Sequence, residues 1–168
     1  HYYNLAWCTL KLGNFKEAVG YLKESYLYEN KKGFVKIGYQ LIDSMLLFYA
    51  YSNKTQEGLK YFNEINIMTF DNLLKYLHYV FENGSKKSLA SIIKSIEELE
   101  LSNDEEHLFL SKKILIYRAT KKIRKLQRSL YVFFKNVLSE EDYRERKVTS
   151  IVKNELIVAT KAFTGYLQ

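Results

Sequence analysis

The sequence predicts an all-α protein built from paired helices, and three observations carry this prediction. First, the 168 residues contain no proline and only seven glycines. Sandwiches and barrels need many tight turns rich in both residues, whereas helices run uninterrupted where proline is absent. Second, apolar residues recur at helical spacing along most of the chain. Third, residues typical of turns lie between consecutive apolar patterns and connect the predicted helices in pairs. The 15 Tyr, 10 Phe and one Trp exclude a disordered chain.

Residues 1–34 are expected to form two short amphipathic helices joined by a tight turn at Gly13-Asn14. The small side chains of Ala6 and Ala18 should let these helices approach closely. Three larger residues are expected to fill the seam between the two helices: Leu5, Phe15 and Leu22.

Two further helix pairs are predicted over residues 39–68 and 70–100. Their turn residues are Asn53 and Gly84, so successive turns, counted from Gly13, are 40 and then 31 residues apart. Such unequal spacing indicates degenerate repeats, with extra residues between the first two pairs.

The last third of the chain predicts a helix pair over 104–138 and a final helix over 139–166. Ser102 and Glu105 have the spacing of a capping box at the start of this pair. The final helix is expected to cap the open end of the repeats, so that 1–168 form a single domain. The chain also opens within a repeat helix, which suggests a fragment of a longer protein that continues the repeats or carries an effector domain upstream.

The first pair resembles the tetratricopeptide repeat (TPR), whose period of about 34 residues lies between the two observed spacings. Thr9 and Asn30 stand where that family usually has an aromatic residue and a proline. The resemblance implies a right-handed superhelical stack whose first helices line a concave, protein-binding surface. The matching places are Tyr2, Leu5, Ala6, Thr9, Gly13, Phe15, Ala18, Leu22 and Ser25.

The uneven repeats, rich in Tyr, Lys and Asn, also resemble the peptide-pheromone receptors of Gram-positive bacteria, of the Rap and PlcR type. This second resemblance implies a short peptide as ligand and the role of a sensor domain in a peptide-responsive regulator.

Aromatic, amide and charged side chains on the first helix of each pair suit an extended peptide, because amides satisfy its backbone and aromatic pockets accept its side chains. Asn4 stands where TPR proteins commonly use Asn to hold a peptide. The alternative is that Trp7 and Tyr51 merely pack between repeats, giving a scaffold without a peptide ligand. The candidate peptide-binding residues are Asn4, Trp7, Lys11, Ser44, Tyr51 and His78.

A basic stretch over 112–128 holds eight Lys and Arg and no acid, whereas the rest of the chain has 18 basic and 19 acidic residues. The net charge of +7 is therefore local. An acidic partner or, with less support, nucleic acid could dock here; a solvated helix face is the alternative. The residues proposed to bind an acidic partner are Lys121, Lys122, Lys125 and Arg128.

Catalytic motifs and cofactor motifs are absent from the sequence, so we expect no enzyme, no cofactor and no metal site. The three histidines, His1, His78 and His107, are far apart in sequence. The single cysteine, Cys8, excludes an internal disulfide and favours the cytosol. No apolar run of 18 residues predicts a membrane span.

Overall fold

The computed structural model describes residues 1–33, 38–83 and 86–137, and within these ranges every regular element is a helix. The predicted all-α fold class is therefore confirmed. The chain divides into two compact units, residues 1–100 and 101–168, whereas the sequence suggested a single domain. Each unit is described by itself below.

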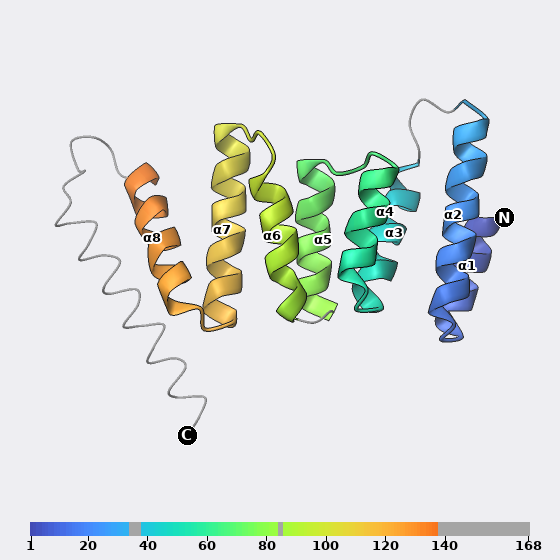
Figure 1. The fold of residues 1–168 in the computed structure, drawn as a ribbon, viewed down its shortest axis with the longest axis horizontal. Coiled ribbons are helices and arrows are strands. Elements are labelled where there is room, and N and C mark those ends of the chain that lie inside the picture. Colours follow the sequence, from blue (N-terminus) through green and yellow to red (C-terminus); the bar gives the residue numbers. More distant parts are fainter. Residues whose placement is uncertain (34–37, 84–85, 138–168) are drawn as a thin grey trace, which may run out of the picture. The chain divides into compact units, whose positions relative to one another are not determined.

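In its described residues, unit 1 contains six α-helices that follow one another as three antiparallel pairs (Figure 1). Helices α1 and α3 end at tight turns, and α5 is followed by a short 3₁₀ turn at Lys86–Ser88. The first pair is α1 (Tyr2–Lys11) and α2 (Phe15–Lys31), the second is α3 (Tyr39–Tyr51) and α4 (Thr55–Glu64), and the third is α5 (Phe70–Asn83) and α6 (Leu89–Glu97).

The turns within the first two pairs form where the sequence predicts them. Gly13 and Asn53 have positive φ angles of 82° and 58°, a conformation that Gly and Asn adopt at the ends of helices. Asn14 then caps α2, since its side chain accepts a hydrogen bond from the Glu17 backbone N–H at 3.3 Å. The third predicted turn residue, Gly84, lies outside the described residues.

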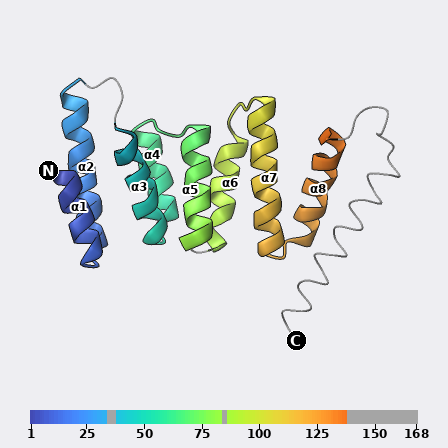
Figure 2. The same ribbon diagram turned by 180° about the vertical axis from the view of Figure 1, so that it is seen from behind.

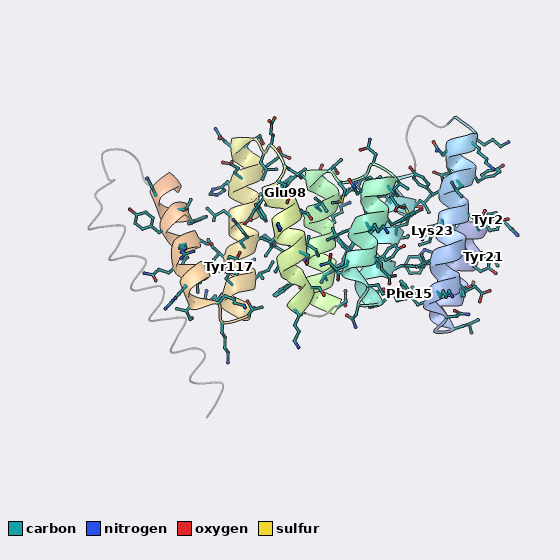
Figure 3. The ribbon with its side chains drawn as sticks, in the orientation of Figure 1. Tyr2, Phe15, Tyr21, Lys23, Glu98 and Tyr117 are labelled. Carbon is teal, nitrogen blue, oxygen red and sulfur yellow. The ribbon has the colours of Figure 1, made fainter. Side chains whose placement is uncertain are left out.

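Small residues bring α1 and α2 together, as predicted, because Ala6 and Ala18 are fully buried and Leu22 packs beside them in the core. The expectation for Leu5 was wrong, because this side chain is 37% exposed. Phe15 is half-buried, and its ring lies near the Phe48 and Tyr49 rings of the second pair, at 6.5 and 6.3 Å between centroids. Figure 3 shows its side chain at the start of α2.

Aromatic rings continue the core from the second pair into the third. Tyr49 of α3 meets Phe62 of α4 edge to face at 5.4 Å between ring centroids, and Phe62 meets Tyr76 of α5 in the same way at 5.0 Å. Such T-shaped contacts are favourable because the positive edge of one ring faces the negative face of the other. This chain of rings ties three helices into one core.

Unit 2, in its described part, is an antiparallel pair formed by α7 (Asn103–Ala119) and α8 (Ile123–Val137). The capping box is confirmed: Ser102 accepts from the Glu105 N–H at 3.2 Å, and Glu105 accepts from the Ser102 N–H at 3.1 Å. Leu126 of α8 is buried at the seam of this unit. The predicted final helix over 139–166 lies outside the described residues.

No helix within the described ranges is long and apolar enough to cross a membrane.

Candidate functional site

The first helices of the three pairs in unit 1, α1, α3 and α5, lie together on one side of the unit (Figure 2). The second helices, α2, α4 and α6, lie on the other side. We call the side formed by α1, α3 and α5 the first-helix surface. It carries the residues that the sequence singled out for peptide binding.

Two side chains of α1, one helical turn apart, hold α1 against α3. The Tyr3 hydroxyl lies 3.3 Å from the buried Ser44 hydroxyl, and the Trp7 ring meets Phe48 edge to face at 5.1 Å. Since Tyr3 and Trp7 are four residues apart, as are Ser44 and Phe48, each set lies along one stripe of its helix. Tyr3 also contacts Trp7 edge to face, which fixes the indole from a second direction.

The contact between α3 and α5 repeats this arrangement with different chemistry. Lys75 reaches the Tyr39 hydroxyl and lies over the Tyr39 ring, with Nζ 3.8 Å from the centroid. One turn further along both helices, the Tyr79 hydroxyl donates a hydrogen bond of 2.6 Å to Asp43. Burial, the hydrogen bond to Asp43 and the Asp43 charge raise the pKa of Tyr79 to about 12.

The second helices contact one another separately. Lys23 of α2 lies over the Tyr61 ring of α4, with Nζ 4.4 Å from the centroid, and Figure 3 shows it pointing from α2 toward the second pair. The Tyr26 hydroxyl donates to the Ile65 carbonyl at 3.2 Å. Contacts on both sides of unit 1 therefore fix the first two pairs against each other.

Four of the six predicted peptide-binding residues are exposed on the first-helix surface. Asn4 and Lys11 are exposed on α1, Tyr51 is 52% exposed at the end of α3, and His78 is exposed on α5 beside the Tyr79 ring.

The other two predicted residues take part in packing. Trp7 is half-buried against Phe48, and Ser44 is only 3% exposed. The Ser44 hydroxyl already donates to the Gln40 carbonyl at 2.8 Å. These two residues therefore connect α1 to α3. Part of the Trp7 side chain remains exposed, whereas Ser44 has almost no exposed surface.

Sequence reasoning missed Tyr39 and Tyr79 as part of this surface. A signal was present in their spacing, because Tyr39/Asp43 and Lys75/Tyr79 are two i,i+4 sets separated by 36 residues. The corresponding sets on α1 and α3 are separated by 41 residues. Because the two spacings differ by five residues, a search for repeats at one fixed period does not align the α1/α3 sets with the α3/α5 sets.

The basic residues predicted to bind an acidic partner lie in unit 2, at the turn from α7 to α8 and in the first two turns of α8. All four are exposed. The residues are Lys121, Lys122, Lys125 and Arg128.

Among the residues that the structure describes, no group of three His, Cys, Asp or Glu side chains is placed to hold a metal ion. Cys8 is exposed on α1 as a free thiol.

The fold and this surface define the chain as an all-helical protein with tandem helix pairs in its first 100 residues. No protein-family model, curated protein or solved structure matches the chain.

Proposed function

We propose that unit 1 is a peptide- or protein-binding module, and that an extended segment of the partner lies along the first-helix surface. The observation that carries this proposal is the repeated contact Tyr3–Ser44 and Tyr39–Lys75. These contacts hold α1, α3 and α5 side by side while Asn4, Lys11, Tyr51 and His78 remain exposed. A rigid base with exposed polar and aromatic groups reduces the entropy lost on binding, since its own side chains are already ordered.

The chemistry of this surface fits a linear peptide. The Asn4 amide can donate to and accept from a peptide backbone, and Lys11 can pair with a carboxylate of the ligand. The exposed ring of Tyr51 and the exposed edge of Trp7 offer apolar area with few rotatable bonds. The single cysteine favours the cytosol, and the resemblance to the peptide-pheromone receptors of Gram-positive bacteria suggests the sensor part of a peptide-responsive regulator.

A second candidate function is a structural scaffold without a peptide ligand. It is favoured by Ser44 and Trp7, which use much of their side chains for contacts between helices. In that case the exposed residues of the first-helix surface contact only solvent and bind no ligand.

The experiment begins with selection of 12-residue peptides from a random library on the full chain, followed by titration of the enriched sequences. A buried polar group that loses its partner costs about 1–3 kcal/mol, so Asn4→Ala should weaken binding roughly tenfold to a hundredfold if Asn4 holds the peptide backbone. The matched control is Asn63→Ala, an exposed asparagine on α4. Its affinity should equal that of the wild type.

Two outcomes would count against the proposal. Equal affinity of Asn4→Ala and wild type, at equal melting temperature, would remove Asn4 from the site. Failure to enrich any peptide would favour the scaffold.

A further inference from the structure

The turn between α7 and α8 gathers positive charge on an exposed surface. Six basic side chains fall within eleven residues of sequence, and all six are exposed. We call this group the basic turn. It consists of Arg118, Lys121, Lys122, Arg124, Lys125 and Arg128.

The backbone of the turn is unusual at Lys121, which has a φ of 58°. This left-handed conformation ends α7 and is normally taken by Gly or Asn, because a β-carbon makes it unfavourable. The Lys122 N–H donates back to the Tyr117 carbonyl at 2.9 Å and closes the turn. A charged residue thus stands where a glycine would fit with less strain.

The start of α8 adds a second unfavourable element. The N-terminus of a helix carries partial positive charge, and acidic residues stabilise it. The first turn of α8 contains no acid, and it begins with Arg124 and Lys125 close behind Ile123. By contrast, α7 begins with Asp104, Glu105 and Glu106. An anionic partner here would lie next to exposed basic side chains and next to the start of α8, where the helix dipole favours negative charge.

Within residues 101–137, the acids lie at the end of α7 that is far from the basic turn. Residues 101–137 contain only three acids, all in the first turn of α7. Along α7, 14 residues separate Asp104 from Arg118, which at 1.5 Å per residue is about 21 Å. The turn lies at the opposite end of α7 from those acids (Figure 1). Charges further apart than about 8 Å are largely screened at physiological salt.

Exposed apolar side chains share a face of α7 with Arg118 of the basic turn. Leu108 and Leu115 are 53% and 57% exposed, and their spacing of seven residues puts them on one face of the helix. Arg118 follows Leu115 by three residues on that face. Ile123, at the start of α8, is also exposed. The surface therefore runs from leucines to a cluster of cations.

We propose that this surface binds an acidic amphipathic segment of another protein. Carboxylates of that segment meet the basic turn through charge-assisted hydrogen bonds, and its apolar side chains cover Leu108 and Leu115. Nucleic acid fits less well, because a charged phosphate backbone would not bury the exposed leucine side chains. In addition, the aromatic ring beside the cluster, Tyr117, is half-buried with Lys125 Nζ 5.8 Å from its centroid, which does not suit base stacking. This proposal concerns unit 2 and is independent of the function proposed for unit 1.

The test uses the full chain and a synthetic 18-residue helical peptide with leucines along one stripe and glutamates flanking it. Two control peptides replace the glutamates by glutamine or the leucines by serine. At about 0.15 M salt we expect the first peptide to bind at least tenfold more tightly than the glutamine control. Binding to the serine control should also be weaker, because it cannot cover Leu108 and Leu115.

Protein variants locate the site. The triple variant Lys122→Glu/Arg124→Glu/Arg128→Glu should lose at least tenfold in affinity for the peptide. The control variant Lys16→Glu/Lys60→Glu/Lys94→Glu makes the same change in net charge at exposed positions on α2, α4 and α6, and it should lose less than threefold. Folding is checked by melting temperature, which the first triple should not lower, because glutamates are favourable at the start of α8. Leu115→Ser provides a variant that leaves the charge unchanged and should also weaken binding.

Three results would overturn the proposal. The first is equal loss in both triple variants, which would mean unspecific attraction by net charge. The second is equal binding of the glutamate and glutamine peptides. The third is tighter binding of duplex DNA, single-stranded RNA or vesicles containing phosphatidylserine than of the acidic peptide, with the same sensitivity to the first triple variant.

Discussion

The hydroxyl of Tyr76 in α5 occupies the space that a β-carbon on Gly58 of α4 would need. From that position it donates a hydrogen bond of 3.2 Å to the Thr55 carbonyl. Tyr49 of α3 approaches the same glycine, since its Cβ would lie 3.0 Å from the added atom. Gly58 therefore sets how closely α3, α4 and α5 can pack.

Gly58→Ala should destabilise unit 1, although alanine is the better helix former. The added methyl group must displace Tyr76 or Tyr49, and overpacking of this kind costs about 1–3 kcal/mol. Gly20→Ala on α2 is the matched control, because nothing lies within 4 Å of the atom it would add. It should stabilise by about 0.5–1 kcal/mol through helix propensity. Urea unfolding followed by circular dichroism measures both changes. Equal effects of the two substitutions would contradict the close packing at Gly58.

Thr55→Val should raise the melting temperature. The Thr55 hydroxyl is buried, with the residue 2% exposed, and among the described residues its Oγ1 has no hydrogen-bond partner. Replacing an unpaired buried hydroxyl by a methyl group of similar shape removes a desolvation cost of about 1 kcal/mol. For a chain of this size that corresponds to roughly 2–4 °C.

Ser44→Ala is the contrasting variant, because the Ser44 hydroxyl is equally buried but donates to the Gln40 carbonyl. Its melting temperature should fall. Thermal unfolding by calorimetry compares the two, and a fall in Thr55→Val would show that its hydroxyl has a partner after all.

Alkaline pH should destabilise unit 1 between about pH 10 and 12. Burial, with a smaller effect of nearby Glu57 and Glu64, raises the pKa of Tyr49 to about 12, against about 10 for an unfolded tyrosine. The unfolded state then loses its proton first as the pH rises. The stabilisation is therefore complete below pH 10 and is lost as the pH approaches 12.

Tyr49→Phe should make the free energy of unfolding less dependent on pH in this window, because one of the titrating groups is gone. Tyr28→Phe serves as the control, since Tyr28 is exposed on α2. Chemical unfolding at pH 8, 10 and 11 measures the slope. An unchanged slope in Tyr49→Phe would mean that Tyr49 titrates alike in both states.

Local features of the fold were predictable from the sequence, because they depend on residues close together in the chain. Gly13 and Asn53 mark turns, Ser102 and Glu105 form the capping box, and the paired helices begin and end near the expected residues.

Contacts between pairs were not predictable in the same way. Leu5 of α1 is 37% exposed, whereas Met45 of α3 is buried. Periodicity identifies the apolar face of a helix, but it does not say which neighbour covers that face. Helix α3 lies between α1 and α5, whereas α1 is the first helix of the row (Figure 2).

The exposure of single residues followed from the sequence more readily than their contacts did. Asn4, Lys11, Tyr51 and His78 are exposed on α1, α3 and α5, and their role in binding stays a prediction. The pattern did not reveal that Ser44 would be covered by Tyr3, because that contact joins side chains 41 residues apart. The left-handed Lys121 also escaped prediction, since lysine carries no turn signal of its own.

The central claim, that a peptide lies along the first-helix surface, is tested most directly by photocrosslinking. A peptide selected on the full chain is synthesised with a benzophenone amino acid at successive positions, irradiated in complex, and its attachment sites are located by mass spectrometry. The account predicts attachment within α1, α3 and α5, at or next to Asn4, Lys11, Tyr51 and His78, with successive peptide positions reaching successive helices. Attachment confined to α2, α4 and α6, or to residues 101–137, would contradict it.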